Sequence, residues 1–269
     1  MKSKVNLSKQ DSAAESDRVA LTDRATDLFR EHGTLFLEGA FPKDLIQRIA
    51  EAFAAKYESI SKKELRKRDA VVGHRRYMVT VDIKKPFNDP TLYANPTVMP
   101  ILEQLLSAHL RIASFGAVAA WPGAEAQPIH LDHPPLFEAD SLGDQLPPYA
   151  VTLVIPLVEV TADMGPTAIW PGSHRSPDRI EQLQQLMTNP DYSDAEQPIT
   201  KLGDAYMMDY RLIHGGMLND SETIRPILYL VYSRPWFRDG FNFTSQPAVQ
   251  ISKKQRKKVP ERWQGLFRG

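Results

Sequence analysis

Cysteine is missing from all 269 residues of this sequence. Disulfide bonds and thiolate metal ligands are therefore excluded, and any bound metal ion must be held by nitrogen and oxygen ligands. An excess of charge is missing as well, because 33 lysines and arginines balance 33 aspartates and glutamates. A chain without net charge has no global field that attracts nucleic acid or an anionic membrane. We therefore expect a small-molecule substrate and no nucleic-acid or membrane partner, with the oligomeric state left open.

Long apolar runs do not occur, and no stretch approaches the length needed to cross a bilayer. The N-terminal residues, MKSKVNLSKQDSAAESD, lack the apolar segment of a secretory signal. Both absences favour a cytoplasmic protein. The hydrophobic fraction of 42% is nevertheless sufficient for a substantial core, and the length suits one large, mainly β domain.

The first third of the chain has the pattern of helices. Residues 1–18 are polar without an apolar period, so we expect a flexible tail there. Apolar residues then recur at helical spacing over residues 21–29 and 45–60, and a third helix is expected over residues 96–106. Thr22 is the expected N-cap of the first helix and Gly33 its stop signal. A short strand over residues 34–38 separates the first two helices, and the charged residues 62–68 read as a solvated helix end or loop.

After Leu110 the pattern changes to short β-rich runs separated by turn residues. The expected strands are 111–121, 127–132, 149–158, 167–170, 205–210 and 227–232, and a helical insertion is expected over residues 178–187. Such runs are typical of an antiparallel sandwich or barrel. We therefore predict a mainly β fold with packed helices, a double-stranded β-helix (a cupin-like jelly roll), forming a single domain over residues 19–269.

The tripeptide His130-Leu131-Asp132 is the strongest chemical signal. In a strand, side chains at positions i and i+2 point to the same face, so an imidazole and a carboxylate can converge on one metal ion. His214 is the best candidate for a third ligand, because it follows a strand-like run and precedes two glycines. Two histidines and one carboxylate form the facial triad of non-haem iron oxygenases, which leaves open positions for a co-substrate and oxygen. A His-x-Asp tripeptide by itself is common by chance, so this hypothesis needs further support.

Arg225 adds to the hypothesis, because it lies eleven residues after His214 with the turn-forming stretch 219–221 between them. Both residues can therefore return to the same level of the fold. A buried guanidinium needs a partner, which a dicarboxylate co-substrate would supply. The alternative is a structural ion pair with Asp209 or Glu222.

Three blocks of this sequence resemble the phytanoyl-CoA dioxygenase family, a branch of the iron(II)/2-oxoglutarate-dependent oxygenases. They are PGAEAQPIHLDHPPLF (Pro122–Phe137), GPTAIWPGSH (Gly165–His174), and GDAYMMDYRLIHGG followed by IRPILYLVYSRPWF (Gly203–Phe237). The resemblance is strong over residues 110–239 and extends weakly back to Leu21. It implies iron(II) as cofactor, 2-oxoglutarate and O2 as co-substrates, and oxidation of a metabolite.

The resemblance also implies roles for individual residues. His130, Asp132 and His214 match the iron ligands, and Arg225 matches the arginine that binds the distal carboxylate of 2-oxoglutarate. Gln127 and Thr167 match two further keto-acid contacts. Some relatives carry a polar residue where this chain has Gly216, so that contact is missing or replaced. The carboxylate of Asp132 favours oxygenation over halogenation, since the related halogenases carry a small residue there.

The sequence gives less information on the primary substrate. The expected pocket residues are Arg76, Tyr77, Met78, Phe137 and Trp236. The resemblance to members that modify natural products favours hydroxylation of a small or medium-sized, largely apolar metabolite. An acyl-CoA substrate is an alternative, favoured only by the basic segment 253–258, and a non-catalytic jelly roll that binds metal or ligand is a second alternative.

Overall fold

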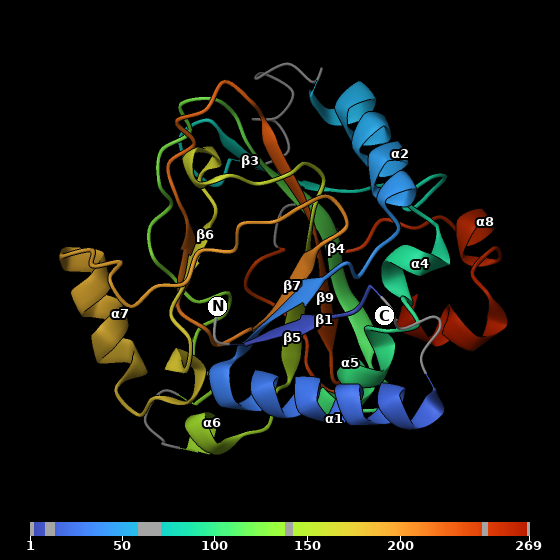
Figure 1. Ribbon diagram of the computed structural model, residues 1–269, viewed down its shortest axis with the longest axis horizontal. Coiled ribbons are helices and arrows are strands. Elements are labelled where there is room, and N and C mark those ends of the chain that lie inside the picture. The colour runs from blue at the N-terminus through green and yellow to red at the C-terminus, as the bar shows by residue number, and fades with distance from the viewer. Residues whose placement is uncertain (1–2, 9–13, 59–70, 138–141, 244–246, 268–269) are drawn as a thin grey trace.

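Figure 1 shows the computed structural model, which describes residues 3–8, 14–58, 71–137, 142–243 and 247–267. The expected charged segment 62–68 lies outside these residues. The helices are α1 (Glu15–His32), α2 (Lys43–Phe53), α4 (Pro90–Tyr93), α5 (Met99–Leu105), α6 (Leu142–Gln145), α7 (Arg179–Thr188) and α8 (Lys253–Arg256). The strands are β1 (Lys4–Asn6), β2 (Thr34–Glu38), β3 (Arg76–Thr80), β4 (Arg111–Ala120), β5 (Ala150–Pro156), β6 (Thr167–Ile169), β7 (Ala205–Asp209), β8 (His214–Gly216) and β9 (Arg225–Ser233).

The strands form two sheets. The large sheet has the order β1-β2-β7-β5-β9-β4-β3, and every pairing is antiparallel except that of β1 with β2. The small sheet pairs β6 with β8. In Figure 1 the helices α2, α4 and α8 lie on one side of the large sheet, and β6 and α7 lie on the other. The predicted mainly β jelly roll with packed helices is confirmed.

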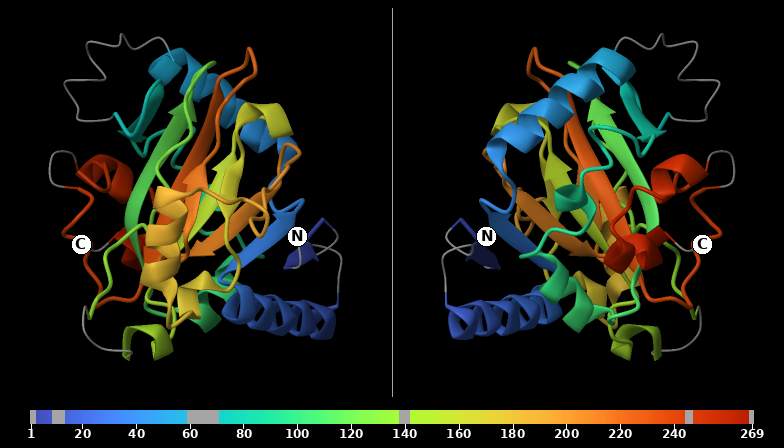
Figure 2. Two further views of the ribbon diagram at one scale, coloured as in Figure 1. Left: turned by 90° about the vertical axis from the view of Figure 1, so that its left-hand side faces the viewer. Right: turned by 90° about the vertical axis from the view of Figure 1, so that its right-hand side faces the viewer.

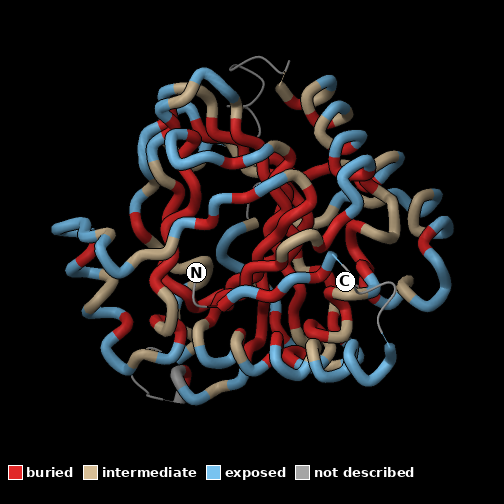
Figure 3. The backbone as a smooth tube through the Cα atoms, viewed as in Figure 1, coloured by how far each residue is buried: buried red, intermediate tan, exposed pale blue. Residues whose placement is uncertain are grey.

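The large sheet is buried on both faces, and alternate residues along each strand serve different layers. On β9, Leu228, Leu230 and Tyr232 join the core beneath the helices. The intervening residues Tyr229 and Val231 face the opposite layer. Figure 3 shows the buried strands at the centre with exposed helix surfaces around them. The face of the large sheet that carries Tyr229 and Val231 lines a cavity between the two sheets.

The chain's first residues differ from the predicted flexible tail. Residues 4–6 form β1, which pairs with β2 at the edge of the sheet and buries Val5 and Leu7. Helix α1 begins at Glu15, and Thr22 lies inside it, donating its hydroxyl to the carbonyl oxygen of Arg18. The first turns of α1 are exposed, so their helical state leaves no apolar period. Gly33 ends the helix in the left-handed conformation, as predicted.

Two further predictions need correction. The segment over residues 127–132 is not a regular strand, because His130 makes only an isolated bridge to His214. The helix predicted over residues 96–106 is present as α5 but is shorter, since it starts at Met99, and the separate short helix α4 precedes it. Figure 2 shows the sheet from both sides, with α7 covering one face and α2 crossing the other. No helix in the described ranges is long and apolar enough to cross a membrane.

Candidate metal centre and co-substrate cavity

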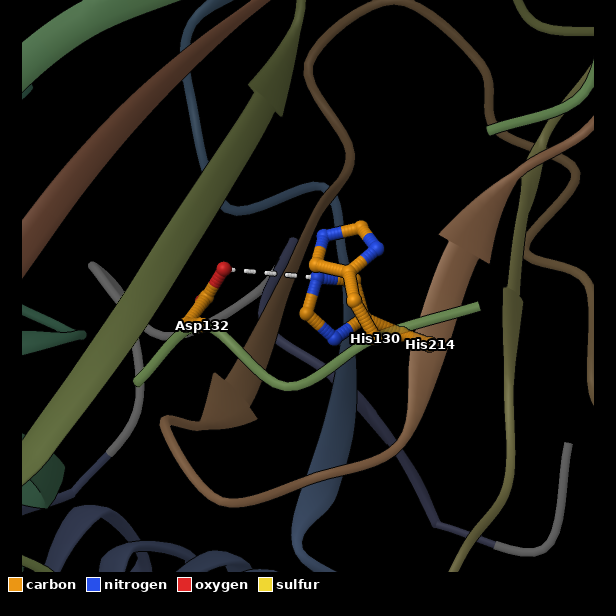
Figure 4. A group of neighbouring side chains, drawn as sticks. All are labelled: His130, Asp132 and His214. Atoms are coloured by element: carbon orange, nitrogen blue, oxygen red, sulfur yellow. Dashed lines mark ion pairs between the residues drawn. The ribbon is translucent and has the colours of Figure 1, made fainter. Parts of the chain in front are cut away.

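Three ligand atoms converge at one end of the cavity between the sheets. The side chains of His130, Asp132 and His214 place one ligand atom each within 4.8 Å of the other two. The Nε2 atom of His214 lies 3.4 Å from Oδ1 of Asp132, and the two imidazole rings are 4.4 Å apart between centroids. Figure 4 shows the three side chains pointing toward a common point. The structure thus brings together the residues that the sequence indicated.

The backbone positions these ligands without forming the strand that was predicted over residues 127–132. The amide of His130 donates to the carbonyl oxygen of His214 at 2.9 Å, and the amide of His214 donates back at 3.0 Å. This single pair of hydrogen bonds aligns the two histidines across the cavity wall. Asp132 follows in an irregular segment, where its Oδ2 atom accepts a hydrogen bond from the hydroxyl of Thr152 on β5 at 3.1 Å.

The hydrogen bonds of the two imidazoles leave the correct nitrogen available to a metal ion. Nδ1 of His130 lies 2.7 Å from the carbonyl oxygen of Pro128, and Nδ1 of His214 lies 2.9 Å from that of Leu212. A carbonyl oxygen only accepts, so Nδ1 carries the hydrogen in both rings and the Nε2 lone pair is free. Two imidazole nitrogens and one carboxylate with open positions opposite them suit a non-haem iron(II) centre.

The protonation states fit the same role. Burial, with the neighbouring His214, lowers the pKa of His130 to about 4, so this ring is neutral at physiological pH. Burial raises the pKa of Asp132, but the adjacent histidines outweigh it and the net shift is downward. Burial lowers the pKa of His214, but the charge of Asp132 outweighs it and the net shift is upward. A proton shared between the last two groups is what a divalent cation would displace.

Two buried guanidinium groups lie near one another, Arg225 in the cavity wall and Arg76 beside Gly216. Arg225 is 2% exposed, and its Nε atom has no hydrogen-bond partner in the described part of the chain. Arg76 is fully buried and donates from Nη2 to the carbonyl oxygens of Glu125 and Met217, while its Nε and Nη1 atoms have no partner there. Burial and the positive charge of Arg225 lower the pKa of Arg76 to about 9, which keeps it protonated at neutral pH.

The expected alternative, an ion pair of Arg225 within the protein, does not occur among the described residues. Asp209 instead binds Arg211 through two hydrogen bonds of 2.8 and 2.9 Å. Glu222 is exposed. Two buried cations therefore lie near one another without a carboxylate partner in the described ranges, and of the two only Arg225 lines the cavity. A dicarboxylate bound in the cavity would compensate the charge of Arg225.

Gly216 makes the space that Arg76 occupies. A Cβ atom at this position would lie 2.7 Å from Nη1 of Arg76 and 2.6 Å from Oε1 of Gln127. Gln127 lines the cavity and accepts a hydrogen bond from the amide of Gly216. Thr167 also lines the cavity, opposite Gly216 in the small sheet, and its hydroxyl bonds that of Tyr206 at 2.9 Å. The guanidinium of Arg76 thus occupies space that a side chain at position 216, two places after His214, would need.

The cavity has a volume of about 220 Å³, and only part of the predicted substrate set lines it. Met78 does so. Tyr77 is on the other face of β3 and packs against Trp121, with ring centroids 5.0 Å apart. Phe137 and Trp236 are 45% and 61% exposed and do not line the cavity. Arg76 is fully buried and does not line the cavity either. These four assignments are corrected, because a sequence pattern does not reveal which side chains on a strand or loop reach the cavity.

The fold and site together define a jelly roll with a two-histidine, one-carboxylate candidate metal site in a cavity that a buried arginine also lines. The chain belongs to the phytanoyl-CoA dioxygenase (PhyH) family, whose model matches residues 29–227. That range includes the three candidate metal ligands and Arg225.

The individual proteins that this chain resembles share low sequence identity with it. The chain is 25% identical over 194 residues to the multifunctional dioxygenase ausE of Aspergillus calidoustus, covering 70% of this chain and 64% of that protein. The crystal structure of HygX from Streptomyces hygroscopicus, with nickel and 2-oxoglutarate bound, has a TM-score of 0.59 and 13% identity, covering 89% of this chain and 96% of HygX. SnoN, a non-haem alpha-ketoglutarate-dependent epimerase from nogalamycin biosynthesis, has a TM-score of 0.58 and 17% identity, covering 88% and 95%.

Proposed function

We propose that this protein is an iron(II)- and 2-oxoglutarate-dependent dioxygenase that oxidises a C–H bond of a small or medium-sized, largely apolar metabolite. One observation carries the proposal. The side chains of His130, Asp132 and His214 line one cavity together with Arg225, a buried guanidinium without a carboxylate partner in the described ranges. A metal centre alone would need no buried arginine beside it, and an anion site alone would need no facial triad.

The roles of the residues follow from this arrangement. His130 and His214 would bind iron(II) through Nε2 and Asp132 through Oδ1, with Thr152 holding the carboxylate in orientation. Arg225 would pair with the distal carboxylate of 2-oxoglutarate, and Arg76 would add positive charge from its buried position beside Gly216. When bound, iron(II) supplies the oxidising chemistry by coupling O2 activation to decarboxylation of 2-oxoglutarate, which gives succinate and carbon dioxide. The protein positions both reactants and excludes bulk water.

Gln127 would support the keto acid through its contact with the amide of Gly216, and Thr167 through its hydroxyl pair with Tyr206. The remaining cavity wall is mostly apolar, including Met78 and Val118. Pockets of this composition bind apolar skeletons with few polar groups. Together with the family resemblance, this favours a natural-product intermediate as substrate and hydroxylation as the outcome.

An acyl-CoA substrate is the competing reading, and the structure gives it no support. The basic segment 253–258 contains α8, which lies on the helix side of the large sheet, away from the small sheet that closes the cavity (Figure 1). Truncation after Ile251 would be a poor test, because Val259, Leu266 and Phe267 belong to the main core. Replacing Lys253 and Lys254, both exposed, with glutamine tests the same idea without removing core residues.

The proposed function is tested by metal content and keto-acid turnover. Under anaerobic loading with iron(II), we expect one iron per chain and, after exposure to O2 with a metabolite panel, substrate-stimulated release of succinate. His109→Ala, at an exposed histidine, should keep the iron, whereas His214→Ala should lose it. Iron and 2-oxoglutarate binding without succinate release under any condition would favour the non-catalytic alternative.

Other features stay predictions from the sequence: a cytoplasmic location, the absence of a nucleic-acid partner, and organisation as one domain over residues 19–269. The last is supported by one main core cluster that includes residues from Ala25 to Phe267, and Val5 of β1 extends this core into the predicted tail.

A further inference from the structure

Six hydroxyl-bearing residues line the cavity, and they fall into two groups. Four of them are hydrogen-bonded to protein side chains: Thr152 to Asp132, Thr167 and Tyr206 to each other, and Tyr210 to Asp239. The other two, Ser114 and Tyr229, have buried hydroxyl oxygens with no partner in the described part of the chain. Ser114 is fully buried and Tyr229 is 8% exposed. Leaving a buried hydroxyl without a partner is costly, so these two groups need an explanation.

Ser114 and Tyr229 lie on neighbouring strands and face the cavity together. In the pairing of β4 with β9, Ser114 is opposite Val231 and Gly116 is opposite Tyr229. A Cβ atom at Gly116 would lie 2.3 Å from the hydroxyl oxygen of Tyr229. The tyrosine hydroxyl therefore lies over Gly116, which is two residues from Ser114 on the same strand. The absence of a side chain at Gly116 allows the arrangement.

The hydroxyl pair is separate from the proposed keto-acid end. Arg225 and Tyr229 share the cavity face of β9 and are four residues apart, which is roughly 13 Å along a strand. The pair is closer to the metal side, because Val231 is flanked by Ser114 on β4 and by Thr152 on β5. Thr152 holds Asp132, so Ser114 stands two strands, roughly 10 Å, from the hydroxyl that orients a metal ligand.

We propose that Ser114 and Tyr229 bind one oxygen atom of the primary substrate, a carbonyl or hydroxyl group on an otherwise apolar skeleton, and thereby decide which carbon lies at the metal. This inference rests on the proposed function and adds a substrate class to it. Each hydroxyl can donate or accept, so a carbonyl oxygen can accept from both and a substrate hydroxyl can satisfy one of each. A few polar groups placed in an apolar cavity fix the orientation of a ligand, which is the role left open for this pair.

The test compares two probes that differ in one group. They are 2-decalone and 2-methylenedecalin, in which a CH2 group replaces the carbonyl oxygen. Binding is measured by ligand-observed saturation-transfer NMR on protein loaded with zinc(II) and 2-oxoglutarate, so the readout does not depend on turnover. We expect the wild type to bind the ketone about tenfold more tightly, and the double variant Ser114→Ala/Tyr229→Phe to bind both probes equally.

A matched control is available on the same strand. The hydroxyl of Tyr232 faces the opposite layer and donates to the carbonyl oxygen of Tyr93 at 2.9 Å. Tyr232→Phe should keep the preference for the ketone but lower the thermal midpoint of the unliganded protein. Tyr229→Phe should lose preference without lowering that midpoint, because its hydroxyl has no partner to lose among the described residues. A lowered midpoint in Tyr229→Phe would assign its hydroxyl to the fold instead.

Three outcomes overturn the proposal: no binding of either probe to the wild type, equal binding of both, or a preference that survives in the double variant. Equal binding would mean that the two hydroxyls are satisfied by water only. The proposed function is judged separately by succinate release. If the protein prefers the ketone but releases no succinate, the hydroxyl site is supported and the proposed dioxygenase function is refuted. If it releases succinate but shows no preference for the ketone, only the hydroxyl site is refuted.

Discussion

Replacing Arg225 with methionine should stabilise the protein in the absence of 2-oxoglutarate. The guanidinium is 2% exposed, and burial lowers its pKa because no carboxylate among the described residues compensates its charge. Methionine fills a similar volume without charge, and it removes the repulsion between Arg225 and the buried Arg76. Since an unsatisfied buried polar group costs about 1–3 kcal/mol, we expect the free energy of unfolding to rise by about that amount.

Binding of 2-oxoglutarate should change in the opposite direction. Removing one side of a desolvated charge pair costs about 3–5 kcal/mol, which raises the dissociation constant by roughly two to four orders of magnitude. The metal content should stay the same, because the three candidate ligand atoms belong to other residues. Urea denaturation of the metal-free protein gives the first quantity, and calorimetric titration of the manganese(II)-loaded protein with 2-oxoglutarate gives the second.

Arg211→Met is the matched control, since this buried arginine has a protein partner. It binds Asp209 through two hydrogen bonds, and both side chains are at most 5% exposed. Its loss leaves a buried carboxylate unpaired and should therefore lower the free energy of unfolding by about 3–5 kcal/mol. If Arg225→Met were destabilised to the same degree and bound 2-oxoglutarate normally, the reasoning about Arg225 would be refuted and a structural role would replace it.

Three further predictions concern the metal and its surroundings. Alanine at any of the three candidate ligands should reduce the iron content, measured by metal analysis, to well below one per chain. If a variant keeps full iron content and full turnover, the residue replaced in it is not an iron ligand. Zinc(II) affinity should fall about tenfold per pH unit below the raised pKa of His214, because a proton stabilised by Asp132 then competes for Nε2; a flat calorimetric profile between about pH 5 and 8 would contradict this. Gly216→Ala should weaken 2-oxoglutarate binding at least tenfold, since its Cβ would meet Arg76 Nη1 at 2.7 Å, with metal content as the control; unchanged binding would show that this guanidinium can move aside.

The sequence by itself indicated the fold class and the set of candidate metal ligands, because both depend on local patterns. Short, nearly continuous apolar runs such as β5 and β9 indicate strands with two buried faces, and a histidine two places before an aspartate puts two ligands on one side of the chain. Local pattern also set the limits of this reasoning. The segment around His130 has the composition of a strand, but it makes only one bridge, to His214. The polar start of α1 shows no period because its first turns face solvent.

Only the tertiary structure decided which polar groups lack a partner. Arg76 was predicted to contact the substrate, yet it is buried beside Gly216 with two nitrogen atoms unpaired among the described residues. The sequence did not indicate that Ser114 and Tyr229 belong to the site, since serine and tyrosine are common in strands. Whether a hydrogen-bonding group is satisfied depends on every atom packed around it, and those atoms come from strands more than a hundred residues apart in the chain. For that reason the cavity, its charge and its unpartnered hydroxyls emerge only when the sheets close on each other.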